Sequence, residues 1–510
     1  MKPKALMVLG TGSGVGKSFI TAGLCRVLND RGLRVAPFKA QNMSNNSFVT
    51  REGGEMGRAQ AVQAECARVE PSVHMNPVLL KPAADDESQV VIHGKAVGHM
   101  RAQTYYGLRE KIWLAIRESY QFLSERYEAI VIEGAGSPAE INLKEFDLVN
   151  FRTAEMADAS CLLVGDIDKG GVFAWLVGTL ALLTEAERER IVGFVINKFR
   201  GDQSLLKPGL EMLEKLSGKK VLGVLPYATD LWIEEEDSLS LESLSNVSQP
   251  ESLDIAVVLL PRISNATDFQ ILGQEPGVSV RMIRRAEEMG EPDLLILPGT
   301  KSTLRDLQYL KKEGLAEKIR DYVRGGGRVL GICGGFQMLG ERIEDPEGVE
   351  SNQRFETGLS LFPFHTRFFE EKILRQVSGR IDGRIFSQPV QANVTGYEIH
   401  MGQTRLSGEI QPLLQVTDKE GKTRSEGAID RSGKILGTYL HGLFDEASFR
   451  GAFLEALRKD CGKPNDSKNQ PVFSAGLIKE KNYERLAGLL RENLDGSFIE
   501  SWLNLSLPLS

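Results

Sequence analysis

Two glycine-rich turns of the chain carry side chains suited to chemistry, and the first has the form of a phosphate-binding loop. The run GTGSGVGKS begins at Gly10 and ends at Ser18, between an apolar run and a helical pattern. Glycines let the backbone N–H groups of such a loop turn toward phosphates, and the helix N-terminus adds partial positive charge. Lys17 would pair with the β- and γ-phosphates of ATP, and Ser18 would hold Mg²⁺. The predicted ATP-binding residues of the loop are Thr11, Gly12, Gly14, Gly16, Lys17 and Ser18.

Two positions of this loop narrow the classes of nucleotide-binding enzyme to which the chain could belong. Thr11 stands where the strict GxxxxGK[ST] motif has its first glycine. The form GTxxxxGK[ST] resembles dethiobiotin synthetase and its relatives, which use ATP to activate a carboxylate. A related branch of partitioning ATPases carries a second lysine five residues before the main one. That position is Gly12 here, which disfavours the branch. The alternative is a glycine-rich turn that binds nothing.

Polar side chains follow three further apolar runs, where parallel sheets bind their ligands. Glu133 follows the run 129–132, and its oxygens suit Mg²⁺, although it could instead cap a helix. Asn197 and Lys198, after the run 192–196, could read a purine edge of ATP or have no contact with it. Asp166 and Asp168 could face the metal or the substrate, or serve only their loop. We expect Glu133 and Ser18 to be the metal ligands.

The run FKAQNMSNNS, from Phe38 to Ser47, is dense in amides and hydroxyls. Such groups are costly to bury without hydrogen-bond partners. The run is therefore interpreted as a loop that binds a polar substrate, with a plain solvated turn as the alternative. The predicted substrate-binding residues are Lys39, Gln41, Asn42 and Ser44.

The second glycine-rich turn, GICGGFQMLG, holds Cys333 after the apolar run 328–332. A nucleophile between small residues at a strand-to-helix turn has the geometry of a nucleophile elbow. The helix N-terminus that follows favours a thiolate and offers N–H groups to an oxyanion. Gly334 and Gln337 from this turn, and Gly299 after the run 294–297, are the predicted oxyanion and glutamine-binding residues. The alternative is a cysteine that only packs in the core.

A cysteine nucleophile needs a base, and the chain has six histidines. His441 lies at the end of a strand-like run and before a glycine, so we favour it over His400. Many class I glutamine amidotransferases place an acid two residues after this histidine. Leu443 stands there instead. We therefore expect a Cys333–His441 dyad, and the possible orienting acids are Glu398 and Asp445.

These residues must be positioned by parallel sheets, because short apolar runs alternate with amphipathic helical stretches. The fold class expected is α/β, with a P-loop parallel-sheet domain and a second α/β domain of the class I glutamine amidotransferase type. An acidic and then serine-rich break at 234–252 separates them. The expected domains are residues 1–235 and 252–450, with a helical extension at 451–510. The expected buried strands are 5–9, 129–132, 161–164, 192–196, 255–260, 294–297 and 328–332.

Composition excludes several classes of protein. The 510 residues are 41% hydrophobic and 26% charged, which is typical of globular domains. A net charge of −7 gives no electrostatic footprint for nucleic acid. The five cysteines form no CxxC pair, which indicates a reducing, cytoplasmic location. No apolar stretch is long enough to span a membrane, and none has the form of a targeting segment.

Taken together, the motifs resemble the cobyric acid synthase family over nearly the whole chain. By that resemblance, the protein amidates the b, d, e and g carboxylates of adenosylcobyrinic acid a,c-diamide in cobalamin biosynthesis, with one ATP per amide. The resemblance implies Cys333 as nucleophile and His441 as its partner. It implies that the protein binds a corrinoid, glutamine, and ATP with Mg²⁺, and that it has no tightly bound cofactor. The resemblance also allows a homo-oligomer. Besides the runs already quoted, it rests on NPVLLKP (76–82), EGAGSPAEINL (133–143), DIDKGGVFA (166–174), NKFRGD (197–202), GYEIHMG (396–402) and YLHGLF (439–444).

Three alternatives stay open at this point. The sister amidase that makes the a,c-diamide shares both domains, and only the FKAQNMSNNS run favours the cobyric acid enzyme. Another glutamine-dependent ligase could act on a nucleotide or a cell-wall carboxylate. From a different class, the first half could be an ATPase switch with an inactive amidotransferase half, although Gly12 and the intact Cys333–His441 pair disfavour it.

Overall fold

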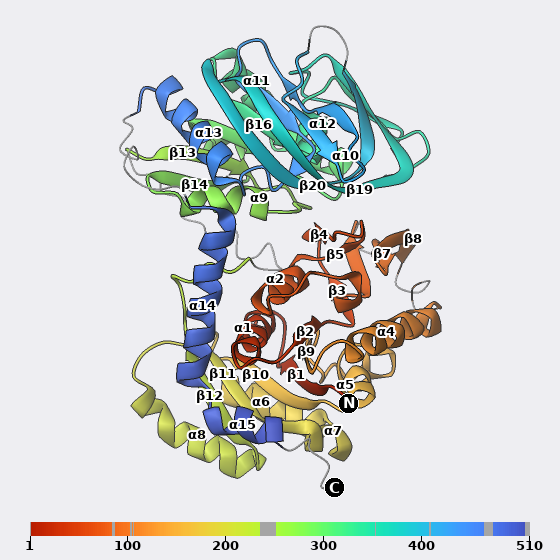
Figure 1. The fold of residues 1–510 in the computed structure, drawn as a ribbon, viewed down its shortest axis with the longest axis vertical. Coiled ribbons are helices and arrows are strands. Elements are labelled where there is room, and N and C mark those ends of the chain that lie inside the picture. Colours follow the sequence, from red (N-terminus) through yellow and green to blue (C-terminus); the bar gives the residue numbers. More distant parts are fainter. Residues whose placement is uncertain are drawn as a thin grey trace.

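The computed structural model describes residues 2–83, 87–101, 105, 107–234, 251–351, 353–406, 410–463 and 473–504. These residues form two α/β domains that stack along the longest axis of the molecule, the N-terminal one below and the C-terminal one above (Figure 1). Most of the composition break at 234–252 lies outside the described residues.

The N-terminal domain is built on a six-stranded sheet in which every strand pair is parallel. Its order is β12-β11-β10-β1-β9-β2. Most of its residues are buried, as expected for parallel strands covered by helices on both faces. The sequence-based strands 5–9, 129–132, 161–164 and 192–196 are confirmed. The observed strands are β1 (Lys4–Gly10), β2 (Val35–Phe38), β9 (Ala129–Glu133), β10 (Ser160–Asp166), β11 (Ile191–Phe199) and β12 (Lys220–Pro226).

Helices cover both faces of this sheet and form two separate apolar cores. One core joins the sheet to α1 (Lys17–Asp30) and α14 (Ala475–Asn493). The helices of the other core are α4 (Arg109–Ser124), α5 (Phe151–Ala157), α6 (Val172–Leu182) and α8 (Gln203–Ser217), and α2 (Arg58–Cys66) and α7 (Glu185–Arg190) complete the domain.

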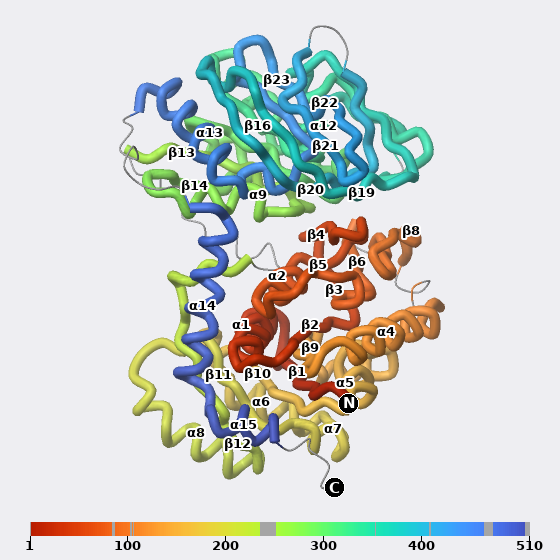
Figure 2. Tube along the Cα trace, viewed as in Figure 1, coloured from red at the N-terminus to blue at the C-terminus, as the bar shows by residue number. Residues whose placement is uncertain are grey.

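Small β-structures lie at the end of the N-terminal domain that faces the C-terminal domain (Figure 2). The FKAQNMSNNS run, expected to be a loop, contains β3, which pairs with β6. A short hairpin of β4 and β5 follows and contacts β19 and β20 of the other domain. These strands are β3 (Gln41–Met43), β4 (Ser47–Val49), β5 (Glu55–Gly57), β6 (Val78–Pro82), β7 (Glu87–Ile92) and β8 (Lys95–Arg101).

The C-terminal domain has a second six-stranded sheet of order β14-β13-β15-β16-β24-β23. Its strands are parallel except β23, and they confirm the runs 255–260, 294–297 and 328–332. The strands are β13 (Leu253–Val258), β14 (Val278–Ile283), β15 (Leu294–Leu297), β16 (Val329–Ile332), β23 (Ala428–Ile429) and β24 (Ile435–Thr438). The helices are α9 (Thr267–Gln270), α10 (Thr303–Lys312), α11 (Leu315–Arg324), α12 (Gly334–Met338) and α13 (Ala447–Asp460).

A long antiparallel hairpin, absent from the sequence-based expectations, dominates the second sheet of this domain. β19 (Phe364–Ile385) and β20 (Gln388–Leu406) pair along nearly their whole length. The two-residue strand β25 (Leu440–His441) pairs with β20, with His441 opposite Tyr397. The remaining strands are β17 (Arg342–Glu344), β18 (Phe355–Thr357), β21 (Leu414–Asp418) and β22 (Thr423–Glu426).

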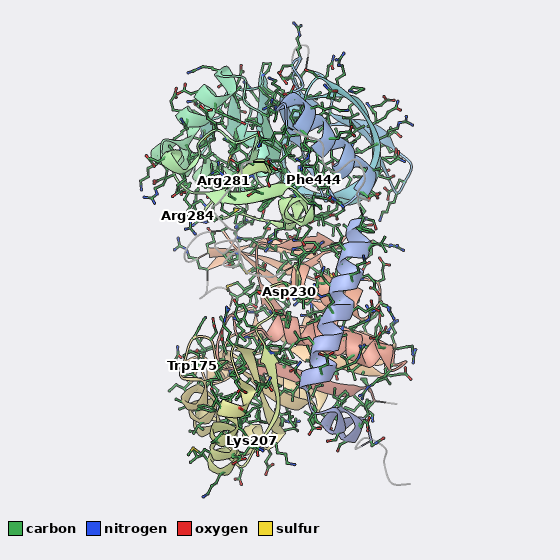
Figure 3. All side chains as sticks on the ribbon, turned by 90° about the vertical axis from the view of Figure 1, so that its left-hand side faces the viewer. Trp175, Lys207, Asp230, Arg281, Arg284 and Phe444 are labelled. Carbon is green, nitrogen blue, oxygen red and sulfur yellow. The ribbon has the colours of Figure 1, made fainter. Side chains whose placement is uncertain are left out.

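The C-terminal helices return to the first domain. After α13, the chain descends as α14 beside both domains, and α15 (Gly496–Asn504) lies near β12 (Figures 1 and 3). Tyr483, Leu486 and Leu490 of α14 are buried. A Cβ on Gly23 of α1 would lie 2.7 Å from Leu490, so α1 and α14 pack closely. Within the described part of the chain, no helix is long and apolar enough to cross a bilayer.

Candidate active sites

The phosphate-binding loop connects β1 to α1, as the sequence predicted. Lys17 Nζ donates hydrogen bonds to the carbonyl oxygens of Gly12 at 2.7 Å and Gly136 at 3.0 Å. Gly16 has a φ of 99°, and a Cβ there would lie 2.1 Å from Asn197 Nδ2. Asn197 itself donates to the Val15 carbonyl oxygen at 2.9 Å. Asn197 therefore braces the loop, and its contact with a purine stays a prediction.

Ser18 and Glu133 meet at the end of the sheet beside this loop. Ser18 Oγ donates to Glu133 Oε1 at 2.7 Å, and Lys39 Nζ donates to the same oxygen at 2.9 Å. Burial opposes the charge on Glu133, but Lys39 and the hydrogen bonds from Gln63 and Ser18 hold its pKa below the ordinary value. A hydroxyl and an ionised carboxylate are the hard oxygen ligands that Mg²⁺ prefers. The residues present therefore fit the expected metal.

Two of the four predicted substrate residues, Lys39 and Asn42, are connected to this acid. Lys39 and Asn42 are almost fully buried. Asn42 Nδ2 donates to Gln60 Oε1 at 2.9 Å, and Gln60 in turn donates to Glu133. Gln41 Oε1 accepts a hydrogen bond from the Tyr105 hydroxyl. This part of the run is therefore linked to the metal-type site.

The other two acids near the loop are paired. Asp166 is buried and accepts a hydrogen bond from Lys198 Nζ at 2.9 Å. Lys198 also donates to the Gly14 carbonyl oxygen at 2.7 Å, so it reaches the phosphate-binding loop. Asp168 pairs with Arg200 at 3.0 Å. Sequence reasoning considered Lys198 only together with Asn197, as a dipeptide that could read a purine edge.

Cys333 lies at the turn between β16 and α12. Its φ of 50° and ψ of −108° are rare for a residue with a side chain, and such strain is typical of a nucleophile elbow. A Cβ on Gly335 would lie 2.0 Å from the Leu297 carbonyl oxygen, so only glycine fits there. Cys333 Sγ lies 3.6 Å from the Ile399 carbonyl oxygen. The turn holds the thiol at the carboxyl ends of the parallel strands in the C-terminal domain.

His441 reaches Cys333 from β25 and is oriented by Asp268. His441 Nδ1 lies 2.6 Å from Asp268 Oδ2, and the Gly442 N–H donates to the other carboxylate oxygen at 2.9 Å. Burial opposes the charged imidazolium, but Asp268 and Cys333 raise the pKa of His441 to about 10. The expected Cys333–His441 pair therefore has a third member in this structure, Asp268, which lies 173 residues from His441 in the sequence.

Neither acid considered from the sequence orients His441. Glu398 pairs with Arg375 and Arg424 instead. Burial raises the pKa of Asp445, and a Cβ on Gly442 would lie 3.2 Å from its carboxylate. Asp268 belongs to the short helix α9, in a stretch that matches no motif. No local signal in the sequence could have found it.

His400, the alternative base, is held away from this role. Its Nδ1 lies 2.7 Å from the Gly402 carbonyl oxygen, and its ring stacks on Tyr439 with centroids 3.8 Å apart. Burial lowers the pKa of His400 to about 4. It lines the pocket beside Cys333 as a neutral ring.

The predicted oxyanion and glutamine residues surround the thiol. A Cβ on Gly299 would lie 3.3 Å from His441 Cε1, and one on Gly334 would lie 2.7 Å from Thr300. Gln337 accepts from Thr303 Oγ1 at 3.1 Å and donates to the Tyr439 hydroxyl at 3.3 Å. Gly299 therefore lies beside His441, and Gln337 lines the same pocket as Cys333.

A pocket opens in front of Cys333 and is lined from both domains. Burial and the cations of Lys372 and Lys81 lower the pKa of Lys301 there, and burial raises the pKa of Glu350. An amino-acid ligand carries one ammonium and one carboxylate group, so a pocket that contains both lysine and glutamate side chains suits it. The lining residues are Lys81, Ser264, Asn265, Thr300, Lys301, Thr303, Cys333, Gln337, Glu350, Phe368, Lys372, Ile399, His400, Met401 and His441.

In comparisons with known proteins, the two halves of the chain match two different domain families. Residues 6–241 match the CobQ/CobB/MinD/ParA nucleotide binding domain, and residues 254–449 match the CobB/CobQ-like glutamine amidotransferase domain. A cobyric acid synthase of Sorangium cellulosum strain So ce56 is 49% identical over 99% of both chains. One of Alkaliphilus metalliredigens strain QYMF is 48% identical over 97% of this chain and 98% of its own. At this similarity and coverage, with both domain models matched in order, the chain belongs to the cobyric acid synthase family.

Proposed function

We propose that this chain amidates the b, d, e and g carboxylates of adenosylcobyrinic acid a,c-diamide with nitrogen from glutamine and energy from ATP. Its family makes it an ATP-dependent, glutamine-hydrolysing amidation ligase of cobalamin biosynthesis. One observation supports the proposal most. A single chain holds Ser18 and Glu133 beside a phosphate-binding loop, and Cys333 beside a buried Asp268–His441 pair.

The C-terminal site is proposed to release ammonia from glutamine. The Cys333 thiolate attacks the side-chain amide carbon, and backbone N–H groups of the turn stabilise the oxyanion. The His441 imidazolium gives its proton to the departing nitrogen, so ammonia leaves and a glutamyl thioester forms. Water then attacks the thioester with His441 as base, which restores the thiolate and releases glutamate. Asp268 keeps the His441 ring in the orientation that both steps need.

The N-terminal site is proposed to activate the corrinoid carboxylate. A carboxylate is a poor electrophile, so transfer of the γ-phosphoryl group from ATP first makes an acyl phosphate. Lys17 and the loop N–H groups hold the phosphates, and Ser18 and Glu133 would hold Mg²⁺, which neutralises phosphate charge when bound. Ammonia then displaces phosphate and forms the amide. Each cycle consumes one glutamine and one ATP.

The corrinoid is proposed to bind near the polar run. Lys39, Gln41, Asn42 and Ser44 would contact it, since Lys39 and Asn42 are linked to the predicted Mg²⁺ site through Glu133 and Gln60. The acidic periphery of the substrate needs cations, and Lys169 and Arg200 are further candidates for that role. We place the enzyme in the cytoplasm, because all five cysteines are free thiols.

The test compares two nitrogen sources. Wild type is incubated with ATP, the a,c-diamide and either glutamine or ammonium chloride, and the amides added are counted by mass spectrometry. We expect Cys333→Ala to lose amidation from glutamine and keep amidation from ammonia, whereas Lys17→Ala loses both. Glutamine-fed product from Cys333→Ala at the wild-type rate, or full activity of Lys17→Ala, would overturn the proposal.

A further inference from the structure

The pocket in front of Cys333 is completed by the N-terminal domain. Lys81 of β6 is one of its lining residues, although Cys333 and His441 belong to the other domain. Lys81 Nζ donates to Glu55 Oε1 at 2.7 Å, and Lys372 Nζ of β19 lies 2.5 Å from Glu55 Oε2. Glu55 is fully buried and comes from β5. One carboxylate of the N-terminal domain therefore holds a lysine from each domain in the pocket.

The charge around this carboxylate leaves the pocket able to take an anion. Glu55 offers one negative charge to the two ammonium groups of Lys81 and Lys372. Lys301 also lines the pocket, where burial and these two lysines lower its pKa and Glu350 opposes that shift. Glutamine brings an α-carboxylate, and a carboxylate bound between ammonium groups forms charge-assisted hydrogen bonds. The two lysines on Glu55 are therefore suited to hold that end of glutamine.

The N-terminal domain also forms hydrogen bonds to Asn265, which lies beside His441. The Asn265 N–H donates to Asn46 Oδ1 at 2.8 Å, and the Ser47 N–H donates back to Asn265 Oδ1 at 2.9 Å. Asn265 Nδ2 lies 3.4 and 3.5 Å from the two ring nitrogens of His441. Asn265 is buried and has a φ of 54°, so its position depends on these partners.

Tyr397 shows the same dependence on the N-terminal domain. Its ring stacks on the His441 ring, with centroids 5.3 Å apart. Its hydroxyl donates to the Ser47 carbonyl oxygen at 3.0 Å. Two neighbours of the catalytic ring, Asn265 and Tyr397, are thus tied to Asn46 and Ser47. Both of these belong to the run whose earlier part reaches Glu133.

We propose that the N-terminal domain is a working part of the glutaminase. Lys81, together with Lys372, binds the α-carboxylate of glutamine, and Asn46 and Ser47 are positioning residues that hold Asn265 and Tyr397 against His441. This inference rests on the proposed role of Cys333 as the glutaminase nucleophile. It assigns residues of the ligase half to the chemistry of the other half.

The first test uses full-length Lys81→Met, which keeps most of the unbranched side chain and removes its charge. We expect the KM for glutamine in glutamate release to rise about tenfold or more, because a charge-assisted contact with substrate is lost. Amidation fed by ammonium chloride should stay at the wild-type rate, which also shows that the variant is folded. A wild-type KM for glutamine would overturn the role of Lys81.

The second test uses Asn46→Ala, with Asn46→Asp as the conservative variant. We expect Asn46→Ala to lower the kcat of glutamate release about tenfold with little change in KM, and Asn46→Asp to recover most of it because an acceptor oxygen remains. The control is Gln376→Ala, which removes another cross-domain hydrogen bond, 2.8 Å long, to the Val49 carbonyl oxygen. This control should release glutamate at the wild-type rate.

The outcomes separate the inference from its alternatives. If the contacts only dock the domains, Asn46→Ala will release glutamate normally and form fewer amides per glutamate, which overturns the positioning role. Equal losses in Asn46→Ala and Gln376→Ala would also overturn it. Failure of the proposed function is distinct, since it would appear as glutamate release by Cys333→Ala.

Discussion

The Asp268–His441 pair sets the protonation of the nitrogen-releasing site. Both side chains are almost fully buried, and their atoms approach to 2.6 Å. A buried pair of this kind is costly to break on one side only, because the remaining group keeps its desolvation penalty. With the pKa of His441 raised to about 10, the imidazolium is the form present at neutral pH. In the proposed mechanism, this imidazolium protonates the departing ammonia.

Asp268→Asn tests this arrangement directly. We expect glutamate release to fall about a hundredfold or more, since the ring loses both its orientation and its charge partner. Without the carboxylate, the pKa of His441 falls, so the alkaline decline of the remaining activity should move from about pH 10 toward neutral pH. The measurement is kcat for glutamate release against pH. An unchanged alkaline limb would contradict the role of Asp268, and ammonia-fed amidation serves as the control.

At the scale of elements, the two domains share one structural motif, in which a buried strand is followed by a glycine-rich turn and then by a helix. In the first domain the turn between β1 and α1 is the proposed phosphate-binding loop, and Gly16 allows it to pass against Asn197. In the second domain the turn between β16 and α12 presents Cys333, and Gly335 allows the helix to approach β15. The chemistry differs because one turn presents N–H groups and the other a thiol.

Gly16→Ala should separate the two activities. The added Cβ would collide with Asn197 Nδ2, and a φ of 99° is strained for alanine. We expect the affinity for ATP to fall at least tenfold and amidation from either nitrogen source to fall with it, while glutamate release persists. Gly178→Ala in α6 is the control, because apart from the adjoining backbone of its own helix no heavy atom lies within 4 Å of its added Cβ. Normal ATP binding by Gly16→Ala, measured by calorimetry, would contradict the assignment.

At the scale of the whole molecule, a buried ion cluster joins three distant segments. Glu234 pairs with Arg58 of α2 at 2.7 Å and with Lys479 of α14 at 2.8 Å. Burial opposes the charge on Glu234, but the two cations hold its pKa below the ordinary 4.5. The last long helix of the chain is thereby fastened to the first domain.

The sign of this shift predicts how stability depends on pH. Because the folded pKa of Glu234 is depressed, its contribution is full above about pH 4.5 and is lost as the pH falls below that value. We expect Glu234→Gln to cost about 3–5 kcal/mol at neutral pH and to flatten the acid side of the stability profile. Asp230→Asn is the control, since its pair with Arg485 is exposed (Figure 3 labels Asp230) and worth less than about 1 kcal/mol. Equal losses in both variants, measured by denaturant unfolding, would contradict the prediction.

What the sequence determined by itself is local in nature. Buried parallel strands are continuous apolar runs, and the turns that follow them need glycines at particular positions, so Lys17, Ser18 and Cys333 could be placed from short stretches. His441 was placed in the same way, by a strand-like run and a glycine. The long hairpin of β19 and β20 was missed because its residues alternate between buried and exposed and contain no long apolar run.

Only the tertiary structure decided which side chains surround the residues that could be placed from the sequence. Asp268 reaches His441 across 173 residues, and Asn46 reaches Asn265 across 219. Such contacts depend on the order of strands in a sheet and on how two domains dock, and neither is written in the spacing of residues. The physical reason is that apolar periodicity encodes burial, whereas the partner of a buried polar group is chosen by the three-dimensional packing around it.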